Sequence, residues 1–223
     1  MSTVTSYLEK YALVSLEKQE KLTRLIGEHA VETDTDTGML RFPGIIEVPI
    51  QVLGTESDNT LTWLWAWADE QAEMPADLLK SSSKLKEWGM HEGIHEFIVP
   101  SVDINNVDGH VLSLIASEVC KASCYYKDPY DGGALFLLLF SDLINRQPSF
   151  DVAGLSRQFS HLVSFYQINH RNALLSYLHL KGLHFIEHGA VMSWELESGE
   201  NVRAEFDRAG RLNSINGKTL SLD

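Results

Sequence analysis

The sequence predicts an α+β fold, in which an antiparallel sheet meander packed by helices is followed by a second helix-plus-β-meander unit. Three observations predict it. Residues 60–68 alternate in the manner of a strand, and residues 191–215 alternate in short runs separated by turns. Residues 6–28 and 109–125 carry apolar side chains at spacings of three and four, which is typical of amphipathic helices.

The first half of the chain begins with the expected helix over residues 6–28, which Gly27 helps to end. Thr37 and Gly38 separate two short strand-like runs and indicate a hairpin. Alternating apolar residues predict the next strand at 45–53, and polar residues indicate a turn at 54–59. These strands and the one at 60–68 form a meander of consecutive antiparallel strands.

The strand at 60–68 contains three of the five tryptophans, Trp63, Trp65 and Trp67. Side chains alternate between the two faces of a strand, so all three indoles are expected on one face. A slip by one residue would replace them with Thr62, Leu64 and Ala66. The register of this strand is therefore strongly specified.

Further elements follow before residue 148. Pro75 opens a helical segment over residues 74–88, and a strand is expected over residues 95–102. Asp108 is a plausible N-cap of the helix at 109–125, where Cys120 and Cys124 would be reduced thiols on neighbouring turns. The remaining segments are predicted as a turn at 126–133 and a buried strand at 134–140.

Polar residues and a change in charge balance indicate a boundary near residue 148, giving an acidic α+β domain at 1–147 and a second domain at 148–223. Asp151 is expected to cap one long helix that reaches Leu180, and Gly182 stops it. Alternating runs separated by turns then predict a β-meander.

The charge of the chain restricts its partners. Residues 1–150 hold 23 acidic and 11 basic side chains, a net charge of −12, whereas residues 151–223 contribute −1. Such an acidic surface repels phosphate backbones and anionic lipids, so we expect neither nucleic acid nor membrane as a partner. A protein with a basic surface is the expected partner. The absence of a signal-like N-terminus and the reduced cysteines predict a cytoplasmic location.

Three segments together resemble a known family. Gln51–Gly54 leads into Thr62–Ala68, Gly89–Ile94 follows, and Tyr125–Gly133 comes last. In this order they resemble an uncharacterised bacterial family, a domain of unknown function, over about residues 5–145. The resemblance implies a cytosolic bacterial α+β domain without an assigned activity, so it transfers no catalytic residue. The part after residue 151 resembles cystatin-like or nuclear-transport-factor-like units in its order of elements alone.

Residues 91–95 match the zinc-protease pattern HExxH, in which two histidines bind the metal and Glu92 would act as the base. Glu118 could be imagined as a third ligand. The pattern requires a regular helix, whereas Gly89 and Gly93 each cost on the order of 1 kcal/mol of helix stability. A structural loop without metal is the favoured interpretation of His91, Glu92 and His95.

Aromatic side chains give a second candidate site. They could line a groove for a peptide or a small apolar ligand, because indole and phenol rings combine contact area with a polar tip. The alternative is a packed core under the helices, and we favour the core. The candidates are Trp63, Trp65, Trp67, Tyr125, Tyr126 and Tyr130.

No nucleophile motif, cofactor motif or catalytic set stands out, so catalytic residues stay unknown and no cofactor is expected. The sequence favours a non-enzymatic protein-binding module, immunity-like or chaperone-like. Two alternatives remain open. One is a zinc-dependent hydrolase that uses the HEGIH segment, and the other is a small-ligand protein with a pocket in the C-terminal domain. The oligomeric state is left open.

Overall fold

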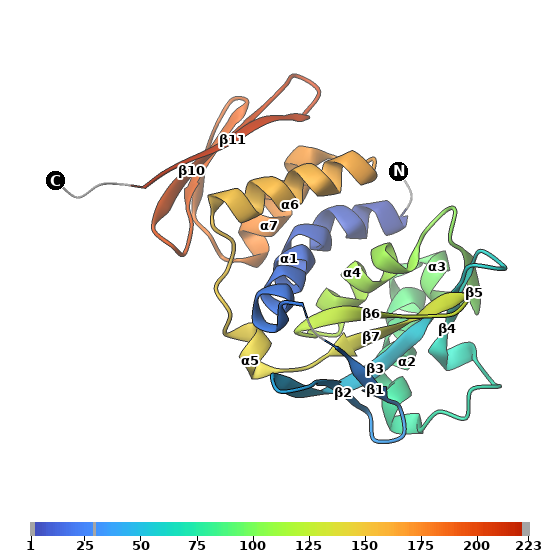
Figure 1. Cartoon of the computed structure of the whole chain (residues 1–223). Coiled ribbons are helices and arrows are strands. Elements are labelled where there is room, and N and C mark those ends of the chain that lie inside the picture. The colour runs from blue at the N-terminus through green and yellow to red at the C-terminus, as the bar shows by residue number, and fades with distance from the viewer. Residues whose placement is uncertain (1–2, 29, 220–223) are drawn as a thin grey trace. The chain divides into compact units, whose positions relative to one another are not determined.

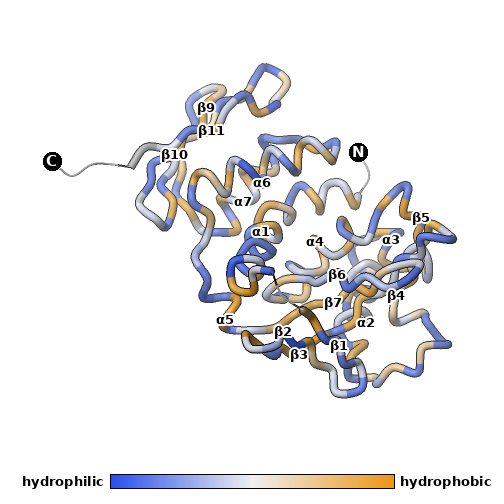
Figure 2. Tube along the Cα trace, in the orientation of Figure 1, coloured by the Kyte–Doolittle hydropathy of each residue, from blue (hydrophilic) through white to orange (hydrophobic). Residues whose placement is uncertain are grey.

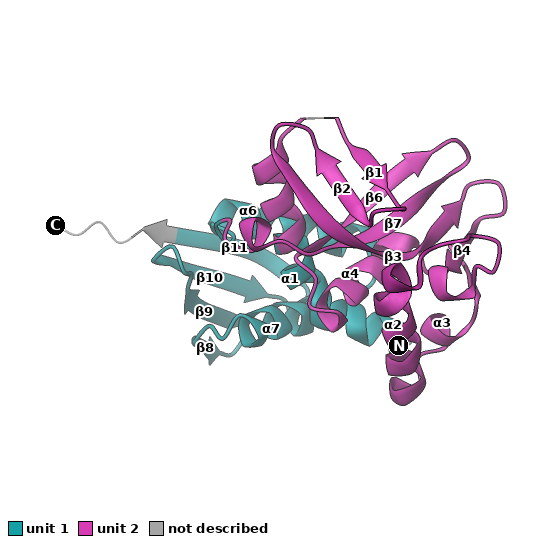
Figure 3. Ribbon diagram, turned by 90° about the horizontal axis from the view of Figure 1, so that it is seen from below, with its two compact units in different colours: residues 1–17, 148–223 teal, residues 18–147 magenta. Residues whose placement is uncertain are grey.

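The computed structural model describes residues 3–28 and 30–219 and has the predicted α+β architecture, with helices and two antiparallel sheets (Figure 1). The chain divides into two compact units, shown in different colours in Figure 3. Unit 1 comprises residues 1–17 and 148–223, and unit 2 comprises residues 18–147. The units differ from the predicted domains because the first part of helix α1 (Thr3–Ile26) groups with the C-terminal residues.

Unit 2 is built on a seven-stranded antiparallel sheet. Neighbouring strands follow the order β1-β2-β3-β4-β5, while β7 also pairs with β3 and β6 pairs with β7. The strands are β1 (Glu32–Asp34), β2 (Met39–Phe42), β3 (Ile46–Ser57), β4 (Thr62–Trp65), β5 (Ser101–Asp103), β6 (Cys124–Tyr130) and β7 (Gly133–Leu139).

Strand β3 is longer than predicted. Its alternation at Val48, Ile50 and Val52 buries one face, as expected, but the predicted turn after Leu53 is wrong because the strand continues to Ser57. The register shifts between Val52 and Gly54. A Cβ atom at Gly54 would lie 2.3 Å from the Leu64 carbonyl oxygen, so glycine here permits a close approach of backbones inside the strand.

The helices of unit 2 correct two predictions. The expected strand at 95–102 is a short helix, α3 (His95–Ile98), followed by β5. Helix α4 (Gly109–Val119) has the predicted cap, since the Asp108 carboxylate accepts the Val111 N–H at 2.8 Å. It ends before residue 125 because Lys121 has a left-handed backbone with φ 58°.

Cys120 is the C-cap of α4 and Cys124 lies on β6, so placing both thiols on neighbouring turns of one helix is wrong. The segment 126–133, predicted as a turn, forms most of β6, with the turn confined to its end. The predicted strand at 134–140 is confirmed as β7. The other helical elements of unit 2 are η1 (Ala66–Ala68), η2 (Ala76–Leu79), α2 (Lys80–Glu92) and α5 (Asp142–Asn145).

One hydrophobic core of unit 2 lies against the middle strands of the sheet. Val48, Val52, Leu137 and Leu139 are fully buried there, and Leu22 of α1 packs into the same cluster. Figure 2 shows hydrophobic residues along β7 and the neighbouring part of β3. None of the described helices combines the length and the apolar character that crossing a bilayer requires.

Unit 1 contains the predicted meander, but the single long helix predicted before it is wrong. Two helices, α6 (Val152–Phe165) and α7 (His170–Leu180), are separated because Asn169 caps the second one by accepting the Asn172 N–H at 3.0 Å. A four-stranded antiparallel sheet follows in the order β11-β10-β9-β8. Its strands are β8 (Phe185–His188), β9 (Val191–Glu195), β10 (Glu200–Phe206) and β11 (Leu212–Thr219).

Candidate functional site

Two of the three indoles share one face of β4. Trp63 and Trp65 are fully buried, and their ring centroids lie 5.2 Å apart. Placing Trp67 on the same strand face is wrong, because β4 ends at Trp65 and Trp67 lies in η1. A turn follows η1, where the Asp69 carboxylate accepts the N–H groups of Gln71 and Ala72. Trp67 is half-buried beneath the Lys86 ammonium, which lies 3.9 Å from its ring centroid.

The three tyrosines lie in different surroundings. Tyr125 is buried and stacks on Phe136, which in turn contacts Trp63 at a centroid distance of 5.2 Å. Tyr126 packs instead against Phe42, and Tyr130 is 52% exposed. The six candidate aromatics are therefore divided between core and surface, and a binding role for them stays a prediction.

A polar cluster occupies the same sheet face at the start of α4. The buried Glu56 carboxylate accepts the Gly109 N–H at 2.6 Å and the Lys127 ammonium at 3.1 Å. A Cβ atom at position 109 would lie 2.9 Å from the Glu56 carboxylate and still closer to two aromatic rings. Glycine therefore allows α4 to begin directly at the Glu56 carboxylate. The positive end of the helix dipole stabilises that negative charge.

His110, the second residue of α4, completes this cluster. Its Nδ1 lies 2.9 Å from the Tyr125 hydroxyl oxygen. Burial is the main cause that lowers the pKa of His110; nearby Lys127 also lowers it, while Asp108 and Glu56 act in the opposite direction. The imidazole is thus neutral near pH 7. With both carboxylate oxygens of Glu56 engaged, the cluster is suited to anchoring α4 on the sheet.

These histidines predict a pH dependence of stability. His170 also has a lowered pKa, mainly through burial, and its Nδ1 accepts the Leu212 N–H at 3.0 Å. In the unfolded chain both histidines return to a pKa near 6.5, so acidification protonates the unfolded state first. We expect the free energy of unfolding to fall as pH decreases below about 6.5 and to level off below the folded pKa values.

Urea denaturation at pH 7.5, 6.5, 5.5 and 5 would measure this slope. The pair of substitutions His110→Gln and His170→Gln should flatten it, whereas His91→Gln, at a side chain that is 84% exposed, serves as the control. An unchanged slope in the double variant would contradict the assignment to these two histidines.

The HEGIH segment does not lie on one helix. His91 and Glu92 end α2, Gly93 takes a left-handed conformation with φ 69°, and His95 begins α3. His91 contacts Glu92 at 2.8 Å. The two histidines therefore do not occupy successive turns of one helix, as the zinc-protease pattern requires. Glu118, the candidate third ligand, forms an ion pair with Lys18 instead. Within residues 3–28 and 30–219, no three histidine, cysteine, aspartate or glutamate side chains are placed to share a metal ion.

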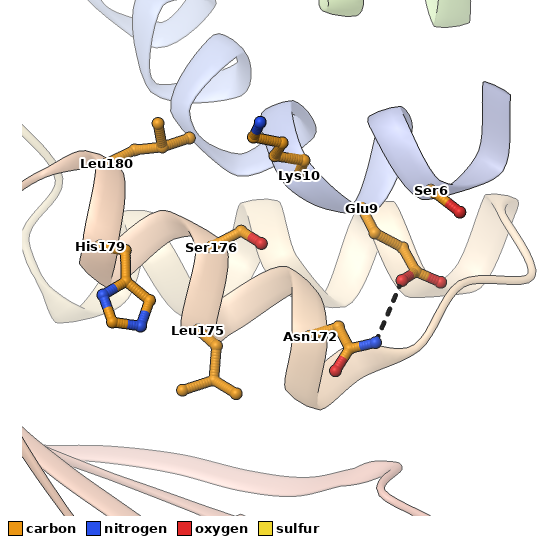
Figure 4. Close-up of a pocket in the computed structure, with 8 residues that line it drawn as sticks. All are labelled: Ser6, Glu9, Lys10, Asn172, Leu175, Ser176, His179 and Leu180. Carbon is orange, nitrogen blue, oxygen red and sulfur yellow. Dashed lines mark hydrogen bonds between the residues drawn. The ribbon is translucent and has the colours of Figure 1, made fainter. Parts of the chain in front are cut away.

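Unit 1 contains an open groove between the first part of α1 and α7, with a volume of about 650 Å³ (Figure 4). Glu9, the acidic residue among those that line it, is 6% exposed. Its carboxylate accepts the Asn169 N–H at 2.7 Å and the Asn172 side-chain amide at 3.4 Å. The groove is lined by Ser6, Glu9, Lys10, Asn172, Leu175, Ser176, His179 and Leu180.

Sequence reasoning did not find the Glu56 cluster or the Glu9 groove. Glu56 and Lys127 fall in segments that the sequence predicts as turns, where charged residues are common. Glu9 falls among the polar residues of the predicted amphipathic helix at 6–28. A signal for Glu56 was present in the sequence, because every second position of the strand from Val48 onward is buried and Glu56 continues this series. Gly54 obscured the series because glycine usually indicates a turn.

Comparison with known families places these features in context. A family model described as "Family of unknown function (DUF6882)" matches residues 5–143, which include β4 and the Glu56 cluster. Comparisons with curated proteins and with solved structures found no match. The predicted resemblance to a domain of unknown function is thereby confirmed. Because the match spans more than half of the chain, the protein belongs to this family of unknown function.

Proposed function

We propose that the protein is a non-enzymatic binding module, immunity-like or chaperone-like, that recognises a protein with a basic surface in the bacterial cytoplasm. The distribution of charge carries this proposal. Residues 18–147, which form unit 2, hold 21 acidic and 10 basic side chains, a net charge of −11, whereas the remaining residues contribute −2. A field of one sign concentrated on one unit steers an oppositely charged partner toward that unit.

Three turns at one end of the unit 2 sheet form the surface that suits such a partner, here called the loop surface. Their exposed aspartates are Asp58 after β3, Asp103 at the end of β5 and Asp131 after β6. Backbone hydrogen bonds connect these turns: Asp58 N donates to Gly132 O at 3.0 Å, and Ile104 N donates to Leu61 O at 3.1 Å. The turns are thus held on a common framework, which limits the ordering cost of binding.

Two apolar side chains accompany the aspartates. Tyr130 is 52% exposed and Leu61 is 46% exposed. Leu61 also has a left-handed backbone with φ 53°, which costs roughly 1–2 kcal/mol for a residue with a Cβ atom. Exposed tyrosine and leucine beside carboxylates suit a partner that combines lysine or arginine with an apolar contact, because tyrosine is frequent among residues that dominate binding energy.

Site-specific photocross-linking tests this proposal. With p-benzoylphenylalanine in place of Tyr130, we expect one reproducible protein adduct in cells that naturally contain the protein. The adduct should weaken at high salt and disappear when Asp58→Asn, Asp103→Asn and Asp131→Asn are combined. The control places the same photoreactive residue at Ile186, which is 75% exposed in unit 1. Equal adducts from both positions, or adducts insensitive to salt and to the asparagines, would contradict the proposal.

A further inference from the structure

Buried carboxylates in this protein have cationic partners, with one exception among the described residues. Four of the five buried glutamates form ion pairs, and Glu9 forms none within residues 3–28 and 30–219. A buried charge without a counter-charge is costly, so this exception requires a physical explanation. The four ion pairs are Glu17–Lys181, Glu20–Arg24, Glu56–Lys127 and Glu118–Lys18.

The surroundings of Glu9 satisfy part of its hydrogen-bonding capacity. The Asn169 N–H and the Asn172 amide each donate to one carboxylate oxygen. Because Asn169 caps α7, the positive end of that helix dipole also lies at the carboxylate, equivalent to about half an elementary charge. An ionised carboxylate offers about four lone-pair sites. Among the residues that the structure describes, two sites therefore stay open to a further donor and no cationic side chain pairs with the carboxylate.

The groove gives such a donor access to Glu9. In Figure 4 the Glu9 side chain reaches toward Asn172, whereas the Lys10 ammonium points away from the Glu9 carboxylate. Lys10 instead lies 5.8 Å and 5.1 Å from the ring centroids of Tyr7 and Tyr11. The groove follows α7 from Asn172 to Leu180, which is eight residue steps and a length of about 12 Å at 1.5 Å per residue.

We propose that this groove binds a small alkylammonium ligand, with Glu9 as the counter-ion of its ammonium group and the α7 side of the groove against its apolar body. Ser176 lies between the two ends and is half-buried, and Leu180 is 40% exposed at the far end. The groove thus combines the buried Glu9 carboxylate with the apolar side chains of Leu175 and Leu180 on α7. This arrangement matches a primary amine on a short hydrocarbon chain. The inference is independent of the partner proposed for unit 2.

Isothermal titration of the full chain with n-hexylamine, n-hexanol and hexanoate tests the proposal. The three probes share a chain length and differ in the charge of their polar end. We expect hexylamine to bind at least about tenfold more tightly than hexanol, because a charge-assisted hydrogen bond is made only by the amine. Hexanoate should bind more weakly than hexanol.

Two variants and one control locate the site. Glu9→Gln should bring the affinities for hexylamine and hexanol together, while Glu195→Gln, an exposed acidic position in the same unit, should leave them apart. Ser176→Phe fills the groove without altering Glu9, so it should weaken hexylamine binding by itself. If circular dichroism shows that the Glu9 variant does not fold, the Ser176 variant decides. Equal binding of hexylamine and hexanol to the natural chain, or no binding of hexylamine, would overturn the proposal.

Discussion

Replacing Trp65 with alanine is expected to lower the free energy of unfolding by about 3–5 kcal/mol. The indole is fully buried against Trp63 and Phe97, with ring centroids 5.2 Å and 5.1 Å away. Its Nε1–H donates to the Glu96 carbonyl oxygen at 2.8 Å. Alanine would leave a cavity and an unsatisfied carbonyl group at the same place. Urea denaturation followed by circular dichroism measures the loss.

Trp67→Ala is the matched control for this prediction. The same substitution two residues later removes a half-buried ring that lies against the Lys86 ammonium, so we expect a loss of roughly 1–2 kcal/mol. The difference between the two variants reports where the strand ends. Equal losses would contradict the end of β4 at Trp65 and favour a strand that continues through Trp67.

The sequence predicted those elements whose signals are local. Amphipathic spacing located α1, the turn residues Thr37 and Gly38 located β2, and alternation located the meander strands β9 and β10. Such patterns work because a strand or helix that buries one face repeats its apolar residues with a fixed period. The Asp108 cap was predictable for the same reason, since its acceptor and donor lie three residues apart.

Elements whose signals conflict were missed. Residues 126–130 contain Asp128 and Pro129, which usually indicate a turn, yet they lie in β6. Proline is tolerated there because, among the described strands, β6 pairs only with β7, so one edge of β6 needs no backbone donor. Gly54 similarly suggested a turn, although its role is to admit neighbouring backbone inside β3. Pro129 and Gly54 each occur in turns and in strands, and the sequence alone does not distinguish the two cases.

The polar sites were invisible for a different reason. Glu56 and Lys127 are 71 residues apart, and Glu9 and Asn169 are 160 apart. Periodicity reports which face of an element is buried, but it carries no information on which distant residue will lie opposite. The same limit applies to α1, where residues up to Glu17 group with the C-terminal part of the chain. Pairing of charged residues across such separations emerges only from the tertiary fold.

Replacing Lys181 with methionine is expected to lower the free energy of unfolding by about 3–5 kcal/mol, because it removes the Lys181 ammonium from the buried Glu17 carboxylate. The Lys181 ammonium lies 2.9 Å from Glu17 Oε1, and Glu17 Oε2 accepts the Tyr177 hydroxyl at 2.7 Å. Burial by itself would lower the pKa of Lys181, but hydrogen bonds and charges from Glu17 and then Glu197 outweigh it and raise that pKa. The ammonium is therefore held in its charged form.

The double variant Glu17→Gln with Lys181→Met distinguishes two causes of the lost stability. One is the buried Glu17 charge without the Lys181 ammonium, and the other is the lost packing of the lysine side chain. Glutamine keeps an oxygen that can accept the Tyr177 hydroxyl and the Phe150 N–H, while no buried charge remains. We expect the double variant to regain most of the stability lost by Lys181→Met, as measured by urea denaturation. If the double variant were as unstable as the single one, packing of the lysine stem would explain the loss. Recovery would instead show that charge neutralisation is what holds the first part of α1 within unit 1.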